Sequence, residues 1–193
     1  MNFQKTIKKE IRCQGIGIHS GKHVSMTIKP AKIDTGINFI RTDLKNKPII
    51  EANLNNVFNT YRSTSIKDND AIIMTIEHFL SACFSLSITN LEIEINNEEL
   101  PILDGGAKKY VDLLIQSGLK KQAKENKKTQ INRYIKISEN ESSIEYFPSK
   151  NFEIVVNIDY QSSILTAQSA ELKKIENFPE EIAPAKTFCF FKE

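Results

Sequence analysis

Hydrophobic and polar residues alternate along three segments in the first half of the chain, 24–29, 37–39 and 91–95. A period of two places every second side chain on the same face of an extended strand, so each segment is predicted to be a half-buried β-strand. Strand signals return in the second half at 134–137, 143–147 and 152–158. The pattern therefore predicts strands in both halves of the chain.

A different spacing predicts two helices. Hydrophobic residues recur at i, i+3, i+4 and i+7 from Ile76, at Phe79, Leu80 and Cys83. This spacing is typical of one face of an amphipathic helix, and Thr75 or an earlier residue is expected to cap its start. A second helix is predicted from about residue 108 to 117, ending at Gly118, because glycine readily adopts the left-handed conformation that closes helices.

A lysine-rich stretch divides the chain. Residues 120–128 carry five lysines and no hydrophobic residue larger than alanine, a composition typical of an exposed linker. We predict a first domain over 1–119, a linker over 120–130 and a second domain over 131–193. Strands followed by segregated helices indicate the α+β class. The second domain is predicted to be incomplete, because no element follows its last apolar run to cover it.

Composition and charge exclude several classes of protein. A chain of 193 residues with 40% hydrophobic and 26% charged residues is typical of a globular protein, and a net charge of +2 with few arginines does not favour a nucleic-acid partner. Three widely spaced cysteines indicate neither a disulfide framework nor a cysteine zinc site. The first residues contain no apolar stretch long enough for a signal peptide, and no run approaches the roughly 18 apolar residues of a transmembrane segment. We therefore expect a cytoplasmic protein.

The candidate chemistry lies at Glu77 and His78, at the start of the first predicted helix, in a chain with three histidines. A carboxylate beside an imidazole offers a general base next to a metal ligand, the minimal apparatus for activating water. Taken alone, such a pair is more often a solvated surface pair. The other histidines, His19 and His23, flank Gly21 in a predicted turn, so their spacing is not that of a helical metal site.

Five blocks carry a family resemblance. They are GIGIHSGK at 15–22, NFIRTDL at 38–44, TIEH at 75–78, PILDGGA at 101–107 and PAKTF at 184–188. Because the blocks occur in this order and at these spacings, the chain resembles the zinc-dependent UDP-3-O-acyl-N-acetylglucosamine deacetylase family of lipid A and lipopolysaccharide biosynthesis. The resemblance runs from about residue 3 to the last residue. It implies two similar layered α/β domains packed through their helices, with the active site between them.

The resemblance also implies roles for individual residues. Glu77 is the general base that activates water, His78 is a ligand of Zn²⁺, and Thr187 polarises the substrate carbonyl or steadies the oxyanion. Asp104 is a supporting residue that orients the site. The expected substrate-binding residues are Ile18, His19, Thr60, Ser63 and Phe188.

Simpler interpretations stay open for several of these residues. Glu77 is also a first-turn carboxylate of the kind that the helix dipole favours. The glycines around His19 also suit a tight turn between strands, and Phe188 is equally well a core aromatic.

The chain departs from the family pattern at three places. Family members commonly show Arg-Thr-Phe-Gly where this chain has KTFC at 186–189, and Asp-Gly-Ser where it has DGG at 104–106. The family's other two zinc ligands, a His and an Asp, and its general acid, a His, lie in a segment without a counterpart here. The zinc site is therefore expected to be incomplete, as in a C-terminally truncated enzyme.

The predicted function is the zinc-dependent hydrolysis of the N-acetyl group of UDP-3-O-acyl-N-acetylglucosamine, which releases acetate. The enzyme class is a hydrolase, a zinc amidohydrolase, and the chain alone is expected to be inactive. Three interpretations stay open: a truncated or decayed gene product, one half of a split enzyme that a second polypeptide completes, or a sequence that was cut short. The alternative from another class is an inactive remnant or a non-enzymatic α+β module that binds nucleotide-sugars.

Overall fold

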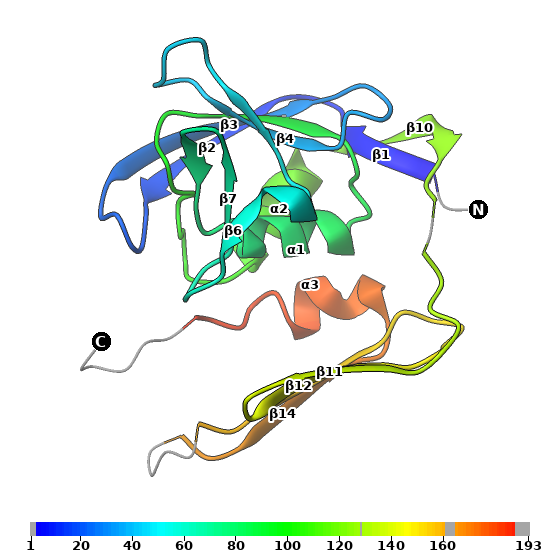
Figure 1. Cartoon of the computed structure of the whole chain (residues 1–193). Coiled ribbons are helices and arrows are strands. Elements are labelled where there is room, and N and C mark those ends of the chain that lie inside the picture. Colours follow the sequence, from blue (N-terminus) through cyan, green and yellow to red (C-terminus); the bar gives the residue numbers. More distant parts are fainter. Residues whose placement is uncertain (1–2, 128, 161–164, 188–193) are drawn as a thin grey trace. The chain divides into compact units, whose positions relative to one another are not determined.

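The structure, a computed structural model, describes residues 3–127, 129–160 and 165–187 (Figure 1). It divides into two compact units: unit 1 is drawn from residues 1–126 and 183–193, and unit 2 spans 127–182. The architecture is mixed α/β and rich in strands. This confirms the predicted combination of helices and strands, while the packing of two similar domains through their helices stays a prediction.

A five-stranded mixed sheet forms the centre of unit 1. In spatial order its strands are β2 (Ile11–Ile16), β3 (His23–Pro30), β9 (Leu91–Ile95), β4 (Ile37–Arg41) and β5 (Ile49–Glu51). Strands β4 and β9 are parallel, and the other neighbours are antiparallel. Every second side chain of β3 and β9 is buried, which confirms the strands predicted from alternation.

Two helices, α1 (Glu77–Ser85) and α2 (Lys108–Gln116), lie together on one face of this sheet (Figure 1). Phe39 of β4, Phe79 of α1 and Tyr110 of α2 pack edge to face, with ring centroids 6.1 and 5.4 Å apart. All three side chains are fully buried. Burying a side chain of this size contributes about 1.5–3 kcal/mol, so this aromatic row helps to hold the sheet and the helices together.

Both predicted helices are confirmed, but the predicted cap of α1 is wrong. The residue that precedes α1 is Ile76, and no side chain caps the helix. Thr75 has a φ of +59°, and its hydroxyl donates a hydrogen bond to Glu99 instead. This hydrogen bond is made to an ionised carboxylate, and such charge-assisted bonds are stronger than those between neutral groups. At the other helix, Gly118 follows α2 with a φ of +73°, as predicted.

The lysine-rich stretch begins as a strand. Strand β10 (Leu119–Glu125) pairs antiparallel with β1 (Phe3–Ile7), so the first six residues of the predicted linker 120–130 lie in a paired strand, although most of their side chains are exposed. Buried polar contacts hold the pair in place, because Asn90 donates hydrogen bonds to Gln4 and to Gln122. Composition alone predicts a linker here because the anchoring side chains are amides rather than hydrophobic groups. The predicted domain limits themselves stay a prediction.

The remaining elements of unit 1 form its edge beside α1. A small antiparallel sheet contains β6 (Val57–Asn59), β7 (Ser65–Asp68) and β8 (Ala71–Ile73), and the short 3₁₀ helix η1 (Leu54–Asn56) precedes it. Ile66 and Ile73 of this sheet are buried. The sheet leads directly into Thr75 and α1, and therefore places the Glu-His motif.

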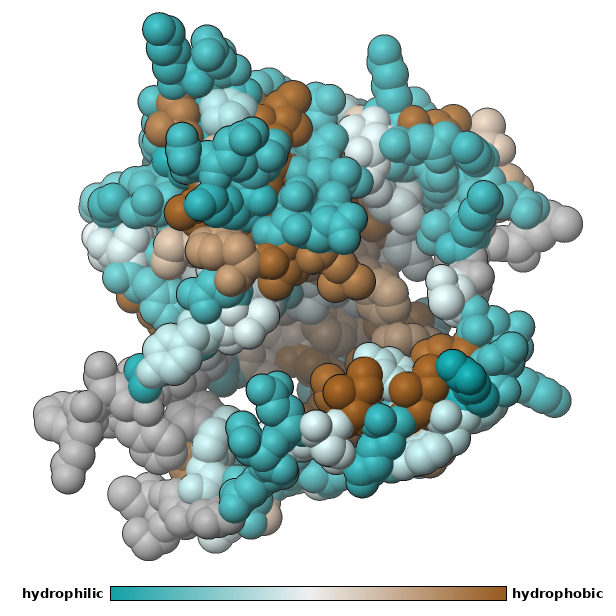
Figure 2. All heavy atoms as spheres, viewed as in Figure 1, coloured by the Kyte–Doolittle hydropathy of each residue, from teal (hydrophilic) through white to brown (hydrophobic). Residues whose placement is uncertain are grey.

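Unit 2 consists of two antiparallel strand pairs and short helical turns. Strand β11 (Ile135–Glu139) pairs with β12 (Ser142–Tyr146), and β13 (Ile154–Ile158) pairs with β14 (Gln168–Leu172). The turns η2 (Ile175–Asn177) and α3 (Phe178–Glu181) follow. Every residue of β11, β12 and β13 is exposed, and hydrophobic side chains lie at the surface of these strands (Figure 2). The helices in the described part of both units are all too short to span a membrane.

Candidate active site around the Glu-His motif

Glu77 and His78 occupy the first turn of α1. Oε2 of Glu77 accepts a hydrogen bond from the backbone N–H of Thr64 at 2.9 Å, and Oε1 lies 4.0 Å from Nε2 of His78. The side chains of Glu77 and His78 are 37% and 20% exposed. One carboxylate oxygen is therefore held by the backbone, and the pair remains accessible from solvent.

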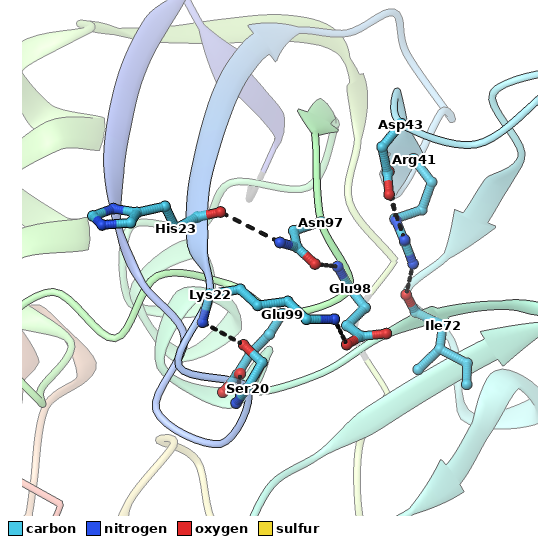
Figure 3. A network of polar contacts seen from close by, with 9 residues as sticks. All are labelled: Ser20, Lys22, His23, Arg41, Asp43, Ile72, Asn97, Glu98 and Glu99. Carbon is cyan, nitrogen blue, oxygen red and sulfur yellow. Dashed lines mark hydrogen bonds and ion pairs between the residues drawn. The ribbon is translucent and has the colours of Figure 1, made fainter.

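A buried carboxylate, Glu99, lies behind this motif. Its Oε1 accepts hydrogen bonds from the N–H of His19 and the hydroxyl of Thr75, both at 3.0 Å. Its Oε2 accepts the N–H of Ser20 at 2.7 Å (Figure 3). Glu99 is 1% exposed. Burial alone raises the pKa of this carboxyl, but the hydrogen bonds from Ser20, His19 and Thr75 outweigh it and hold the pKa below its usual value. Glu99 is therefore an anion at neutral pH.

Gly17 is what lets the loop of His19 approach Glu99. A Cβ atom at Gly17 would lie 2.3 Å from Oε2 of Glu99 and 2.4 Å from Oγ of Ser20. Sequence reasoning missed Glu99, because nothing in the pair Glu98-Glu99 indicates which of the two is buried. The available signal was Gly17, whose missing side chain marks a close approach.

Two groups of polar contacts near Glu99 involve Lys22 and Arg41. The ammonium of Lys22 pairs with Glu98 at 2.8 Å at the surface, beside the Ser20–Glu99 contact (Figure 3). Arg41 is 6% exposed and donates to both oxygens of Asp43, at 2.8 and 2.7 Å, and to the carbonyl of Ile72 at 2.8 Å. The hydrogen bonds from Arg41 hold the pKa of Asp43 below its usual value. The NFIRTDL block is therefore structural, because it ties the end of β4 to β8.

A second cluster joins the PILDGGA and PAKTF blocks. The carbonyl of Ala183 accepts the N–H groups of Ala107 and Lys108, at 3.1 and 2.9 Å, which satisfies amides at the start of α2. The N–H of Thr187 donates to the carbonyl of Gly105 at 2.7 Å. The structure therefore brings Thr187 next to the loop of Asp104, although 82 residues separate Thr187 from Gly105 in the chain.

Within this second cluster the ammonium of Lys186 pairs with Asp104. Burial raises the pKa of the Asp104 carboxyl, but the hydrogen bonds from Lys186 and Gly106 outweigh it and lower the pKa overall. A Cβ atom at Gly106 would lie 2.6 Å from the carbonyl oxygen of Ala185. Glycine at the position where the family commonly has serine therefore allows the PAKTF segment to approach this closely.

The other predicted substrate-binding residues are dispersed. Ile18 is 49% exposed beside His19, which is also exposed, and Thr60 is exposed in the turn after β6. Ser63 is buried next to Thr64, the residue whose N–H holds Glu77. Phe188 lies outside the described residues. The backbone of His19 is thus linked through Glu99 to Thr75, and Ser63 precedes the residue that holds Glu77. The roles of the predicted substrate-binding residues stay predictions.

The described residues do not form a complete zinc site. Catalytic zinc typically has three protein ligands and one open position. Within 3–127, 129–160 and 165–187, no three His, Cys, Asp or Glu side chains are arranged to hold a metal ion. Cys13 is a free thiol whose pKa burial raises to about 11, so a thiolate ligand is not favoured there. His78 with Glu77 therefore offers one imidazole and one carboxylate, fewer donors than the ion needs.

Comparison with known proteins identifies the family. A family model described as UDP-3-O-acyl N-acetylglycosamine deacetylase matches residues 4–193. Three relatives named UDP-3-O-acyl-N-acetylglucosamine deacetylase, from Syntrophus aciditrophicus, Geotalea uraniireducens and Thermodesulfovibrio yellowstonii, are 38%, 35% and 39% identical over the whole of this chain. The chain spans 62%, 63% and 66% of their respective lengths. The match over the five motif blocks confirms the predicted resemblance, and the chain belongs to the UDP-3-O-acyl N-acetylglycosamine deacetylase family.

Proposed function

We propose that this chain carries the water-activating part of a zinc-dependent deacetylase that acts on UDP-3-O-acyl-N-acetylglucosamine. The reaction hydrolyses the N-acetyl group and releases acetate, in an early step of lipid A biosynthesis. The observation that supports this most strongly is the pair Glu77 and His78, held at the first turn of α1 by the N–H of Thr64. The relatives that the whole chain matches are named for this reaction.

In this proposal Glu77 is the general base. Its Oε2 is occupied by the N–H of Thr64, so Oε1 is the oxygen that takes the proton of the attacking water. His78 would offer one imidazole to a zinc ion, which typically has three protein ligands in a catalytic site. The second cluster contributes Thr187, whose hydroxyl steadies the oxyanion while its N–H is held by Gly105. Asp104 orients this segment through Lys186.

The substrate is a nucleotide-sugar that carries an acyl chain. Ile18 is a half-exposed hydrophobic side chain at the tip of a loop, which suits contact with the acyl chain. The other residues proposed to bind the substrate are His19, Thr60, Ser63 and Phe188. A second polypeptide that supplies the missing zinc ligands and the general acid is the proposed partner.

The test is complementation. The purified chain is mixed with the part of the Syntrophus aciditrophicus enzyme that it does not cover, in the presence of Zn²⁺ and substrate, and acetate is measured. We expect no measurable release by either part alone and release by the mixture. Glu77→Ala is expected to lower that release by about 10²–10⁴-fold, the usual contribution of a general base. Glu98→Gln, a surface variant paired with Lys22, is the control and is expected to change it little.

Two outcomes would contradict the proposal. If the parts assemble by size-exclusion chromatography and bind substrate but release no acetate, the chain is a nucleotide-sugar-binding module. If the chain alone releases acetate in a zinc-dependent manner that Glu77→Ala leaves unchanged, the base is a different residue.

A further inference from the structure

Glu99 lies at a junction between two of the motif blocks, and none of the roles above uses it. We infer that Glu99 is a positioning residue that fixes the loop of His19 and the turn before Glu77 and His78 relative to each other. This inference rests on the proposed function for the meaning of those positions. The coupling itself concerns the fold of the chain and is measurable without substrate or metal.

The three donors to Glu99 come from distant parts of the chain. His19 and Ser20 are 80 and 79 residues away in sequence, and Thr75 is 24 residues away. One carboxylate therefore holds the GIGIHSGK block with one set of contacts and the TIEH block with another. Because Glu99 is 1% exposed, solvent cannot replace any of these hydrogen bonds when they break.

The turn at Thr75 is strained and depends on this contact. Its φ of +59° lies in the left-handed region, which is an outlier for a β-branched residue. The hydroxyl of Thr75 is held by Glu99, and the preceding residue, Met74, is hydrogen-bonded on both sides, to Glu98 and to Leu100. Glu77 begins α1 two residues later. A relaxation of Thr75 would therefore redirect the start of the helix that carries the Glu-His motif.

The charge of the side chain matters as much as its shape. A carboxylate only accepts hydrogen bonds, so both oxygens of Glu99 suit the three donors that face them. In Glu99→Gln an amide NH₂ must face either the N–H of Ser20 or the pair of donors at His19 and Thr75. The volume is unchanged, but either Ser20 loses its acceptor or His19 and Thr75 lose theirs together.

The neighbouring Glu98 provides a matched control. It has the same side chain one position earlier, yet it is 37% exposed and pairs with Lys22 at the surface. Glu98→Gln changes the charge of the molecule by the same amount as Glu99→Gln. It leaves the contacts of Glu99 to His19, Ser20 and Thr75 intact.

The experiment is NMR on the full, metal-free chain. We compare amide exchange at His19, Ser20 and the core residue Ile93, and the imidazole resonances of His78, between the wild type and both variants. In Glu99→Gln we expect about tenfold to hundredfold faster exchange at His19 or Ser20, with Ile93 unchanged. The imidazole resonances of His78 are expected to shift, although Glu99 makes no hydrogen bond to His78. Glu98→Gln is expected to cause neither change.

A second variant keeps the test decisive if Glu99→Gln does not fold. Thr75→Val preserves the branched shape and removes only the hydroxyl, and we expect it to shift the resonances of Ser20 and His78 together. The inference is overturned if Ser20 and His78 are unchanged in Thr75→Val. It is also overturned if Glu99→Gln accelerates exchange at Ile93 as much as at Ser20, or if Glu98→Gln has the same effect. These readouts need neither zinc nor acetate release, so they are independent of whether the proposed function holds.

Discussion

Units 1 and 2 are both rich in paired strands, but they differ in how far the hydrophobic side chains of these strands are exposed to solvent. In unit 1, Phe39 and Ile93 are 0% exposed beneath α1 and α2. In unit 2, Ile137 and Val155 are each 60% exposed, although the strands that carry them are paired in full register. Figure 2 shows hydrophobic surface over these strands. Backbone hydrogen bonds therefore pair the strands, but a hydrophobic core forms only where a second layer covers the sheet.

The difference lies in the helices. The two α-helices in the described part of unit 1, α1 and α2, are each nine residues long and contain buried side chains such as Phe79 and Tyr110. The single α-helix in the described part of unit 2, α3, has four residues, none of them buried. An isolated pair of strands is marginally stable in water, because it exposes both of its faces. Unit 1 is therefore expected to provide most of the stability of the chain.

The largest expected effect comes from truncating one hydrophobic side chain in each environment. Phe79→Ala is expected to lower the free energy of unfolding by about 3–5 kcal/mol, because the cavity between Phe39 and Tyr110 cannot be filled. Val155→Ala, at an exposed position of β13, is expected to change it by less than about 0.5 kcal/mol. Urea denaturation followed by circular dichroism measures both values. A comparable loss in both variants would mean that β13 is packed in a core, and the contrast between the units would be wrong.

Proteolysis is expected to distinguish the two units at their lysines. Lys120, Lys121 and Lys124 lie in β10, which is paired with β1, so trypsin needs a local opening to reach them. Arg133 and Lys150 of unit 2 lie outside strands and are exposed. We expect cleavage after Arg133 or Lys150 to be about a hundredfold faster than within β10, as measured by mass spectrometry of timed digests. Equal rates would show that the β1–β10 pair opens as readily as unit 2.

The sequence predicts the elements of the core well and its polar contacts poorly. Alternation found β3, β4 and β9, and helical spacing found α1 and α2, because in each case the buried face is hydrophobic. Strand β10 was predicted as a linker because its anchor is Gln122, an amide whose partners are distant in the chain.

In the candidate site, too, some residues are predictable from the sequence and others are not. Its motif residues Glu77, His78 and Asp104 are recognisable from short blocks of sequence. Glu99 was missed, because its partners His19, Ser20 and Thr75 converge only in the folded chain. A hydrophobic pattern reports which face is buried, but it does not report which polar side chain a distant loop requires.

The third prediction concerns pH and the buried guanidinium of Arg41. Asp43 has a lower pKa in the folded chain than in the unfolded chain, where it is about 3.9, because Arg41 hydrogen-bonds to its ionised form. Its contribution is therefore fully present above about pH 4 and is lost as the pH falls through the folded pKa. Asp43→Asn is expected to cost about 1–2 kcal/mol at pH 7, reduced by the partial exposure of Asp43 to solvent.

The measurement is urea denaturation of both proteins from pH 7 to pH 3. The difference in unfolding free energy between the wild type and Asp43→Asn should shrink as the pH falls. Glu99 and Asp104, whose pKa values are also lowered, are present in both proteins and cancel in the difference. A difference that stays constant across this range would show that Arg41 does not stabilise the ionised form of Asp43.

The smallest effect tests whether the strands of unit 2 pair at all in solution. Lys136 of β11 and Glu145 of β12 are direct cross-strand partners, and the ammonium of Lys136 donates to Glu145 at 2.8 Å. The hydrogen bond from Lys136, and then that from Tyr134, hold the pKa of Glu145 below its usual value. Because the pair is exposed, we expect a small depression that Lys136→Met reduces and that 0.5 M salt weakens. NMR titration of the Glu145 carboxyl measures it, and a carboxyl that titrates at its ordinary pKa in the wild type would mean that this ladder is not formed.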